Sequence, residues 1–216
     1  MIDIVFVTNN KTSYLWLMTR RAISTARENA GMQIGKVVIV EECRTARELL
    51  GTKMLYYDFE FNYNKCLNLG FSICESKYVA FCNNDLYFKQ DWAKNAVYAM
   101  KAHGFLSVSP TPRQTFGGLK VGYEIGKHVL GWCIIMDRVV MDKIGGFDTP
   151  VNFWYSDDVY AEQLKAAGIK HALVGTSIVK HLESQSLRKA VKGKMRANMQ
   201  LGQRKLFDQY KKEKYG

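Results

Sequence analysis

One carboxylate and two amides follow a strongly apolar run near the middle of the chain. Asn83-Asn84-Asp85 comes directly after Tyr78–Cys82, a run whose residues predict a buried strand. A carboxylate here could bind a hard divalent cation, with substrate phosphates and water supplying the other oxygens. Because it is a single carboxylate, the site would be weak without such a ligand. The alternative is an Asx turn that leads into the next helix.

Two adjacent carboxylates, Asp157-Asp158, follow the aromatic run Phe153-Trp154-Tyr155 and open a predicted helix. Acids are common in the first turn of a helix because they cap the backbone and complement the helix dipole. The other interpretation makes one of them a general base that takes the proton from an attacking hydroxyl. A neighbouring charge raises a carboxyl pKa and a helix N-terminus lowers it, so the sequence leaves the net shift open.

Further polar side chains stand where predicted strands end. Glu41-Glu42 closes the run Lys36–Glu41, and it could accept hydrogen bonds from a ribose or a base or lie in a solvated turn. His181, at the end of Ile178–His181, could bind a metal or a phosphate or be structural. Each of these signals is weak when taken alone.

Predicted strands and helices alternate through the first half of the chain. This favours an α/β, Rossmann-like fold with a doubly wound, mostly parallel sheet, whose ligands bind beyond the carboxyl ends of the strands. No G-x-G-x-x-G or Walker sequence occurs, so we expect no glycine-rich phosphate turn. The expected strands are Ile2–Thr8, Lys36–Glu41, Lys53–Tyr57, Tyr78–Cys82, Phe105–Val108 and Ile178–His181. The expected helices are Thr12–Ala30, Asn64–Glu75, a helix capped by Asp91, Asp137–Ile144, Asp157–Ala167 and a basic helix from Ser186 onward. Residues 109–128, rich in glycine, predict a long loop, or a loop with short strands.

The composition fits one domain, or one domain with an appendage, in 216 residues. Hydrophobic residues make up 47%, which excludes disorder throughout. Five cysteines form no C-x-x-C pair, which predicts free thiols in a reducing cytosol. We find no signal peptide and no apolar run near the roughly 18 residues of a membrane span, so we expect a cytoplasmic protein.

Positive charge is concentrated toward the C-terminus. Residues 187–216 contain ten Lys or Arg and two Asp or Glu, a balance of +8 within a net charge of +11 for the chain. This indicates an anionic partner, either DNA or an anionic membrane surface, with a solvated lysine-rich helix as the alternative. The residues expected to bind the anion are Arg188, Lys189, Lys192, Lys194 and Arg196. We therefore predict a domain over 1–186 and a basic helical extension over 187–216.

The order of the motifs resembles that of the family 2 glycosyltransferases, which have the GT-A fold, over residues 1–186. The elements that carry the resemblance are Thr8-Asn9, Glu41-Glu42, the Asn-x-Gly of Asn68 and Gly70, Asn83-Asn84-Asp85, Gly145-Gly146-Phe147-Asp148, Tyr155–Tyr160 and Val179–Ser186. Three positions depart from the family pattern. Asn83 replaces the first acid of the D-x-D motif, Asp157 stands where the family often has Glu, and Tyr160 replaces a later acid. The metal role then falls mainly on Asp85.

The resemblance implies inverting transfer of a sugar from a nucleotide diphosphate sugar, such as a UDP-sugar, with Mn²⁺ or Mg²⁺ as cofactor. It implies that Asp158 is the general base and that Asp85, helped by His181, holds the metal. The residues implied to bind the donor are Thr8, Asn9, Glu41, Asn68, Asn83 and Asn84. The residues implied to contact the sugar or the acceptor are Trp154, Tyr155 and Asp157.

The acceptor stays open between classes. Size, charge and activity are similar to those of the bacteriophage DNA glycosyltransferases. This resemblance implies hydroxymethylated cytosine in DNA as the first candidate acceptor and the host cytoplasm as the location of the enzyme. A cell-surface or lipid-linked glycan is the alternative acceptor. A further alternative is a non-catalytic nucleic-acid-binding protein on a GT-A scaffold, against which the retained Asp85, Asp158 and His181 argue.

Overall fold

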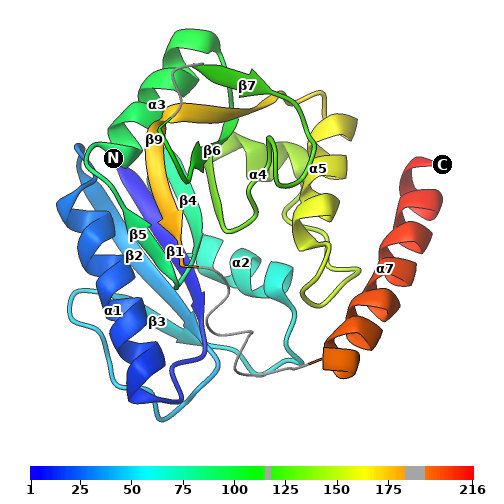
Figure 1. Cartoon of the computed structure of the whole chain (residues 1–216), viewed down its shortest axis with the longest axis horizontal. Coiled ribbons are helices and arrows are strands. Elements are labelled where there is room, and N and C mark those ends of the chain that lie inside the picture. The colour runs from blue at the N-terminus through cyan, green and yellow to red at the C-terminus, as the bar shows by residue number, and fades with distance from the viewer. Residues whose placement is uncertain (115–117, 183–192) are drawn as a thin grey trace.

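The computed structural model describes residues 1–114, 118–182 and 193–216, with only the backbone at 193–196 (Figure 1). The strands are β1 (Ile2–Thr8), β2 (Ile34–Glu41), β3 (Lys53–Tyr56), β4 (Tyr78–Asn83), β5 (Leu86–Phe88), β6 (Ser107–Thr111), β7 (Leu119–Val121), β8 (Cys133–Asp137) and β9 (His171–His181). The helices are α1 (Ser13–Glu28), α2 (Tyr63–Phe71), α3 (Trp92–His103), α4 (Val139–Ile144), α5 (Ser156–Ala166) and α7 (Gly193–Tyr215). The predicted order of elements is present, but β5, β7 and β8 were not among the expected strands, and β9 begins at His171 and not at Ile178.

The described strands form one sheet in the order β3-β2-β1-β4-β8-β6-β9-β5, with β7 paired to β9. β3, β2, β1 and β4 run parallel, as predicted, whereas β8 is antiparallel to both β4 and β6. β1 and β2 end in register, with Thr8 opposite Glu41. β4 ends at Asn83, beside Val7 of β1. The polar residues that follow these three strands therefore meet at one edge of the sheet.

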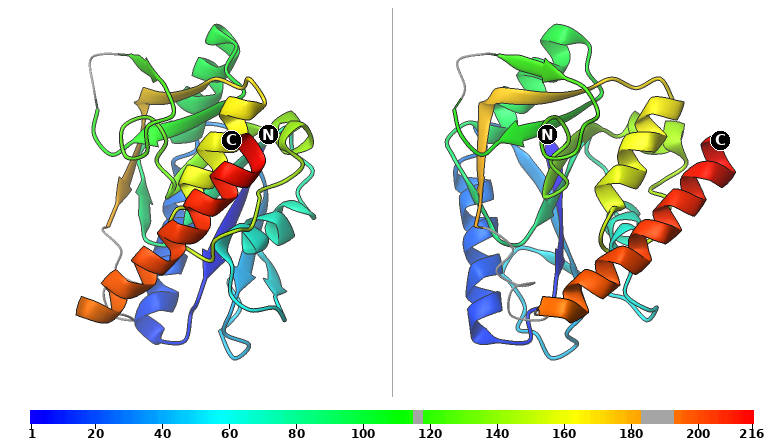
Figure 2. Two further views of the ribbon diagram at one scale, coloured as in Figure 1. Left: turned by 90° about the vertical axis from the view of Figure 1, so that its right-hand side faces the viewer. Right: turned by 45° about the vertical axis from the view of Figure 1, so that its right-hand side comes forward.

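Helices cover both faces of the sheet, which is the doubly wound arrangement (Figures 1 and 2). α1 and α3 pack on one face, where Phe6 and Trp92 are fully buried. α2, α4 and α5 pack on the other face, around Phe81 and Tyr160. Because β1 and β4 are buried on both faces, their sequences are continuous apolar runs without alternation.

One local feature differs from the sequence prediction. Asp91 precedes α3, but its φ is 59° and its side chain makes no cap hydrogen bond. A capping side chain normally needs an extended backbone at that residue, so the left-handed conformation removes the cap. The described part of the segment 109–128 includes β7, which extends the sheet along β9.

α7 is a 23-residue helix that lies beside α5 (Figure 2). Lys194 and Arg196 are in its first turn, where only the backbone is described, and Arg188, Lys189 and Lys192 lie outside the described residues. Within the described part of the chain, the helices are all too short or too polar to span a bilayer.

Candidate active site

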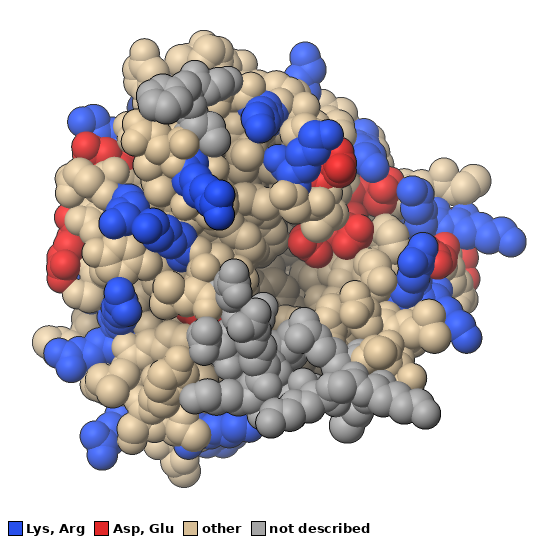
Figure 3. Space-filling view, viewed as in Figure 1, with Lys and Arg blue, Asp and Glu red and all other residues tan. Residues whose placement is uncertain are grey.

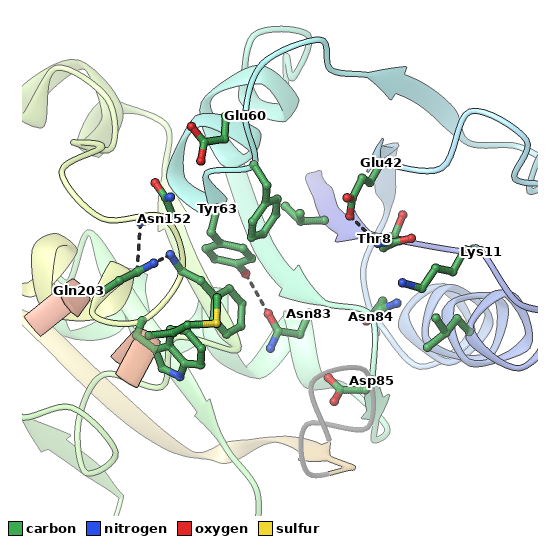
Figure 4. A pocket seen from close by; sticks show the side chains of 17 residues that line it. Thr8, Lys11, Glu42, Glu60, Tyr63, Asn83, Asn84, Asp85, Asn152 and Gln203 are labelled. Carbon is green, nitrogen blue, oxygen red and sulfur yellow. Dashed lines mark hydrogen bonds between the residues drawn. The ribbon is translucent and has the colours of Figure 1, made fainter. Parts of the chain in front are cut away.

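A cavity of about 480 Å³ opens at the carboxyl ends of β1 and β4 (Figure 4). Polar residues that follow these strands form one side, and aromatic residues form the opposite side. The lining residues are Val7, Thr8, Asn9, Lys11, Leu15, Glu42, Glu60, Phe61, Tyr63, Asn83, Asn84, Asp85, Asn152, Phe153, Trp154, Met199 and Gln203. The structure thus brings together five of the residues predicted to bind donor or metal, together with Trp154.

Glu41 is fully buried below this cavity. Its carboxylate accepts hydrogen bonds from Thr8 Oγ1 at 2.6 Å, from the Asn10 backbone and side chain, and from the Cys43 amide. With its acceptor positions used in this way, Glu41 holds the two strand ends together and does not line the cavity. Glu42, its neighbour, lines the cavity together with Glu60 and Asp85, and a contact of Glu41 with the nucleotide stays a prediction.

The amides after β4 are held by neighbouring side chains. Tyr63 Oη donates to Asn83 Oδ1 at 2.8 Å, and Asn84 Nδ2 donates to Thr19 Oγ1 at 3.0 Å. These bonds come from α2 and α1, so both helices fix the strand end. Asn83 therefore has a defined orientation although it replaces an acid.

Asp85 and His181 form a pair at the end of β9. Asp85 Oδ1 lies 3.1 Å from His181 Nε2, and the indole of Trp132 stacks on the imidazole with ring centres 5.5 Å apart. Cis ligands of an octahedral cation at about 2.1 Å are themselves about 3 Å apart, so the pair fits two positions of a Mg²⁺ or Mn²⁺ site. The described residues contain no group of three or more His, Cys, Asp or Glu that could hold a metal. Substrate phosphates and water would have to supply the remaining ligands.

A second cavity of about 270 Å³ adjoins the first. The two share Tyr63, Asn83, Phe153 and Trp154 as lining residues. The residues that line only the second are Gly131, Trp132, Tyr155, Ser156, Asp157 and His181. Asp85 lines the first cavity and its partner His181 lines the second, so the pair lies where the two cavities meet.

Asp157 is the acid that faces the second cavity, whereas Asp158 lines neither cavity. Burial and the neighbouring Asp158 raise the pKa of Asp157 to about 6, against the lowering effect of backbone N–H groups at the start of α5. Burial also raises the pKa of Asp158. The side-chain hydrogen bond between the two carboxyl groups raises the pKa of Asp157 and lowers that of Asp158. Protonation of the two acids is therefore linked.

Asn68 has a structural position away from both cavities. Its side chain donates to the Phe147 carbonyl and accepts from the Phe147 amide, both at 2.9 Å. These two hydrogen bonds tie α2 to the turn between α4 and α5. Both functional groups of the Asn68 amide are thus used within the protein, and its contact with the donor stays a prediction.

Some cavity residues were not predicted from the sequence. These are Lys11, Glu42, Glu60, Phe61, Tyr63, Met199 and Gln203. Lys11 stands two residues after Asn9 and could have been found from that proximity. Gln203 gave no signal, since a glutamine in a basic helix is ordinary.

Lysine and arginine side chains are spread over the face of the molecule drawn in Figure 3, and three cations gather around Tyr87 of β5. Arg21 of α1 and Lys89 each lie about 5 Å from the ring centre of Tyr87, and Tyr87 is opposite Lys180 in the pairing of β5 with β9. None of these three cations forms an ion pair with a described acid. We call Arg21, Tyr87, Lys89 and Lys180 the basic patch.

The sequence model described as "Glycosyl transferase family 2" matches residues 37–164. The chain belongs to this family. No curated protein matches the glycosyltransferase. Among solved structures it is similar to TarS 1–349 of S. aureus, with a TM-score of 0.62 and 14% identity, and to the same protein in complex with UDP, with a TM-score of 0.61 and 13% identity. Each match covers 82% of this chain and 59% of the TarS chain, so the enzyme spans well under two thirds of that structure. The likeness shows the GT-A fold that the motifs predicted.

Proposed function

We propose that this glycosyltransferase moves a sugar from a nucleotide diphosphate sugar to an acceptor hydroxyl, with inversion at the anomeric carbon. The observation that carries the proposal is the meeting of two cavities at Asp85 and His181, with Asp157 in the second cavity. A donor in the first cavity and an acceptor in the second would have the transferred sugar at their junction. The UDP bound to TarS supports a uridine diphosphate sugar as the donor.

The donor contacts follow from the chemistry of the first cavity. Glu42 offers a carboxylate to ribose hydroxyls or to a base, and Lys11 offers a positive charge to the diphosphate. Thr8 and Asn9 line the same side, and Asn9 Nδ2 donates to Glu42. The aromatic residues opposite provide an apolar wall for the sugar or the base.

The residues that would hold a divalent cation are Asp85 and His181, with Asn83 beside them. The bound cation would neutralise the charge that develops on the departing diphosphate. Trp132 fixes the ring of His181 by stacking and so keeps Nε2 toward Asp85.

Inverting transfer is a single displacement. The acceptor oxygen bonds to the anomeric carbon as the bond to the diphosphate oxygen breaks, and the acceptor proton passes to a carboxylate. The family resemblance favours Asp158 as that carboxylate, and the lining of the second cavity favours Asp157. We assign the proton to the pair, because protonation of the two hydrogen-bonded carboxyl groups is linked.

Donor hydrolysis tests this function directly. The enzyme is incubated with a panel of nucleotide sugars, with and without Mn²⁺ and with a chelator. We expect hydrolysis that depends on the metal, and we expect Asp85→Ala to reduce it at least tenfold. The matched control is Asp142→Ala, which removes an exposed acid from α4. Absence of hydrolysis and of donor binding for every sugar would instead support the non-catalytic alternative, while full activity of Asp85→Ala with chelator would contradict the metal role.

We further propose DNA that contains hydroxymethylated cytosine as the acceptor, which is the finer part of the function. The supporting observation is the basic patch on β5 and β9, the strands that adjoin Asp85 and His181 in sequence, because uncompensated cations suit a phosphodiester backbone. The C-terminal helix supports DNA as the acceptor less strongly than its basic composition suggested. Lys211 pairs with Glu162 at 3.3 Å and Lys214 with Asp148, so both charges are used within the protein.

The acceptor is tested by transfer of labelled sugar to hydroxymethylated DNA and, in parallel, to a glycan extract. Label in the DNA alone supports the proposal. Label in the glycan alone would replace DNA by the cell-surface or lipid-linked glycan.

A further inference from the structure

α7 contributes Met199 and Gln203 to the lining of the first cavity, and Gln203 also binds the backbone of the cavity wall. Gln203 Oε1 accepts hydrogen bonds from the Asn152 amide at 3.1 Å and from the Phe153 amide at 2.9 Å, and its side chain lines the first cavity (Figure 4). The segment it holds carries Phe153 and Trp154, which line both cavities. One side chain from the C-terminal helix thus satisfies two amides of the wall between the cavities.

A second contact of α7 reaches the start of α5. The ring of Phe207 stacks on that of Tyr155, with centres 5.7 Å apart and planes 9° from parallel. Tyr155 has a φ of 67°, a left-handed conformation that costs a non-glycine residue on the order of 1 kcal/mol or more. Such a conformation persists only when its surroundings fix it, and Asp157 follows two residues later.

Further contacts fasten α7 on both sides of this segment. Tyr210 and Lys214 bind Asp148, which precedes the segment. Lys211 binds Glu162 of α5, which follows it, at 3.3 Å. The helix therefore spans residues 148–162 from outside and holds the segment between two anchored ends.

We propose that α7 is a working part of the active site, in which Gln203 and Phe207 are positioning residues for the segment 152–157. They keep Trp154 in the wall between the cavities and hold the start of α5 so that Asp157 faces the second cavity. The effect on transfer rests on the proposed function, because it requires Asp157 to act on the acceptor. The effect on the conformation of the segment does not.

The test compares substitutions of one glutamine with those of another on the same helix. Gln203→Ala and Gln203→Leu remove the acceptor, whereas Gln203→Glu keeps an oxygen in the same place. Gln200→Ala is the matched control, since Gln200 is exposed and has no described partner. We expect kcat for transfer to fall about 10- to 100-fold in Gln203→Ala and Gln203→Leu, because a displacement of about 1 Å has effects of this size. We expect the donor KM to stay within about twofold, and Gln203→Glu to recover most of kcat.

Hydrogen exchange at the Asn152 and Phe153 amides supplies a readout that does not need activity. We expect faster exchange in Gln203→Ala than in Gln200→Ala, and near-normal exchange in Gln203→Glu. Unchanged kcat and unchanged exchange in Gln203→Ala would overturn the proposal. Faster exchange with unchanged kcat in an active enzyme would overturn its catalytic part. If the unmodified enzyme transfers and hydrolyses no donor, the proposed function fails, and the exchange data alone then decide whether α7 positions the segment.

Discussion

Asp157 and Asp158 form the feature of the site with the clearest consequence for pH. A carboxylate must be ionised to accept a proton from the acceptor, and the pKa of Asp157 is raised to about 6. We therefore expect kcat/KM to fall as the pH drops below about 6, by tenfold for each further pH unit. A pH profile of transfer measures this decrease in kcat/KM. The profiles of Asp157→Asn and Asp158→Asn show which of the two acids causes it. A profile that stays flat down to pH 4.5 would contradict the assignment to the pair.

The same shift predicts an effect on stability. A raised pKa means that folding disfavours the ionised form of Asp157. The cost is fully present above pH 6, declines as the pH falls through that value, and is absent below the unfolded pKa near 3.8. The difference corresponds to roughly 3 kcal/mol at neutral pH. We expect Asp157→Asn to raise the free energy of unfolding at pH 8 by up to about that amount, with little gain at pH 4. Urea unfolding at both pH values measures it, and an equal or greater gain at pH 4 would contradict it.

At the residue level, the sequence predicted which kinds of residue lie at the site better than it predicted the role of each one. The polar side chains at the ends of β1 and β4 line the first cavity because strand ends are where a parallel sheet leaves room for ligands. The sequence could not show which of Glu41 and Glu42 faces the cavity, because the direction of each side chain depends on the residue at which the strand ends. Asn68 could not be recognised as a structural amide, because its partner is 79 residues away in the chain.

α2 and β1 pack unusually closely, and Gly70 is the reason. A Cβ at this position would lie 2.3 Å from Val5 Cγ1 and 3.1 Å from Val40 Cγ2. We expect Gly70→Ala to destabilise the protein by about 1–3 kcal/mol through overpacking. Thermal and urea unfolding measure the change.

The matched control for this substitution is Gly202→Ala in α7. Nothing lies within 4 Å of a Cβ there, so the alanine should stabilise the helix by about 0.5–1 kcal/mol. Equal effects of the two substitutions would show that close packing of α2 is not what requires Gly70.

Among the elements, continuous apolar runs could be predicted, whereas β5, β7 and most of β9 could not. β1, β2 and β4 are apolar runs buried on both faces, and such runs are visible in sequence. β5 has three residues and exists because it pairs with β9, far along the chain. α7 was predicted as a basic helix, but its packing on the segment before α5 depends on a few polar contacts that carry no periodic signal.

Lysine and arginine side chains are spread over the face of the molecule drawn in Figure 3, and the basic patch is the group for which we propose phosphate contacts. If phosphates bind there, the affinity for DNA falls with salt, and removing one contact reduces the slope of log K against log salt by about 0.9. We expect Lys89→Ala and Lys180→Ala each to show this reduction while donor hydrolysis stays unchanged. Lys143→Ala, an exposed lysine of α4, serves as the control. Equal slopes in all three variants would contradict the proposal that the basic patch binds the phosphates of the acceptor.

The contacts of α7 also order events during synthesis of the protein. Thr8 and Gln203 line the same cavity although 195 positions separate them in the chain. A nascent chain that has passed β9 holds the sheet, the acid pair and the Asp85–His181 pair, but it lacks the glutamine that secures the wall between the cavities. We expect the enzyme to gain its transfer activity only after translation has passed α7, so that a partly made chain leaves the donor pool untouched.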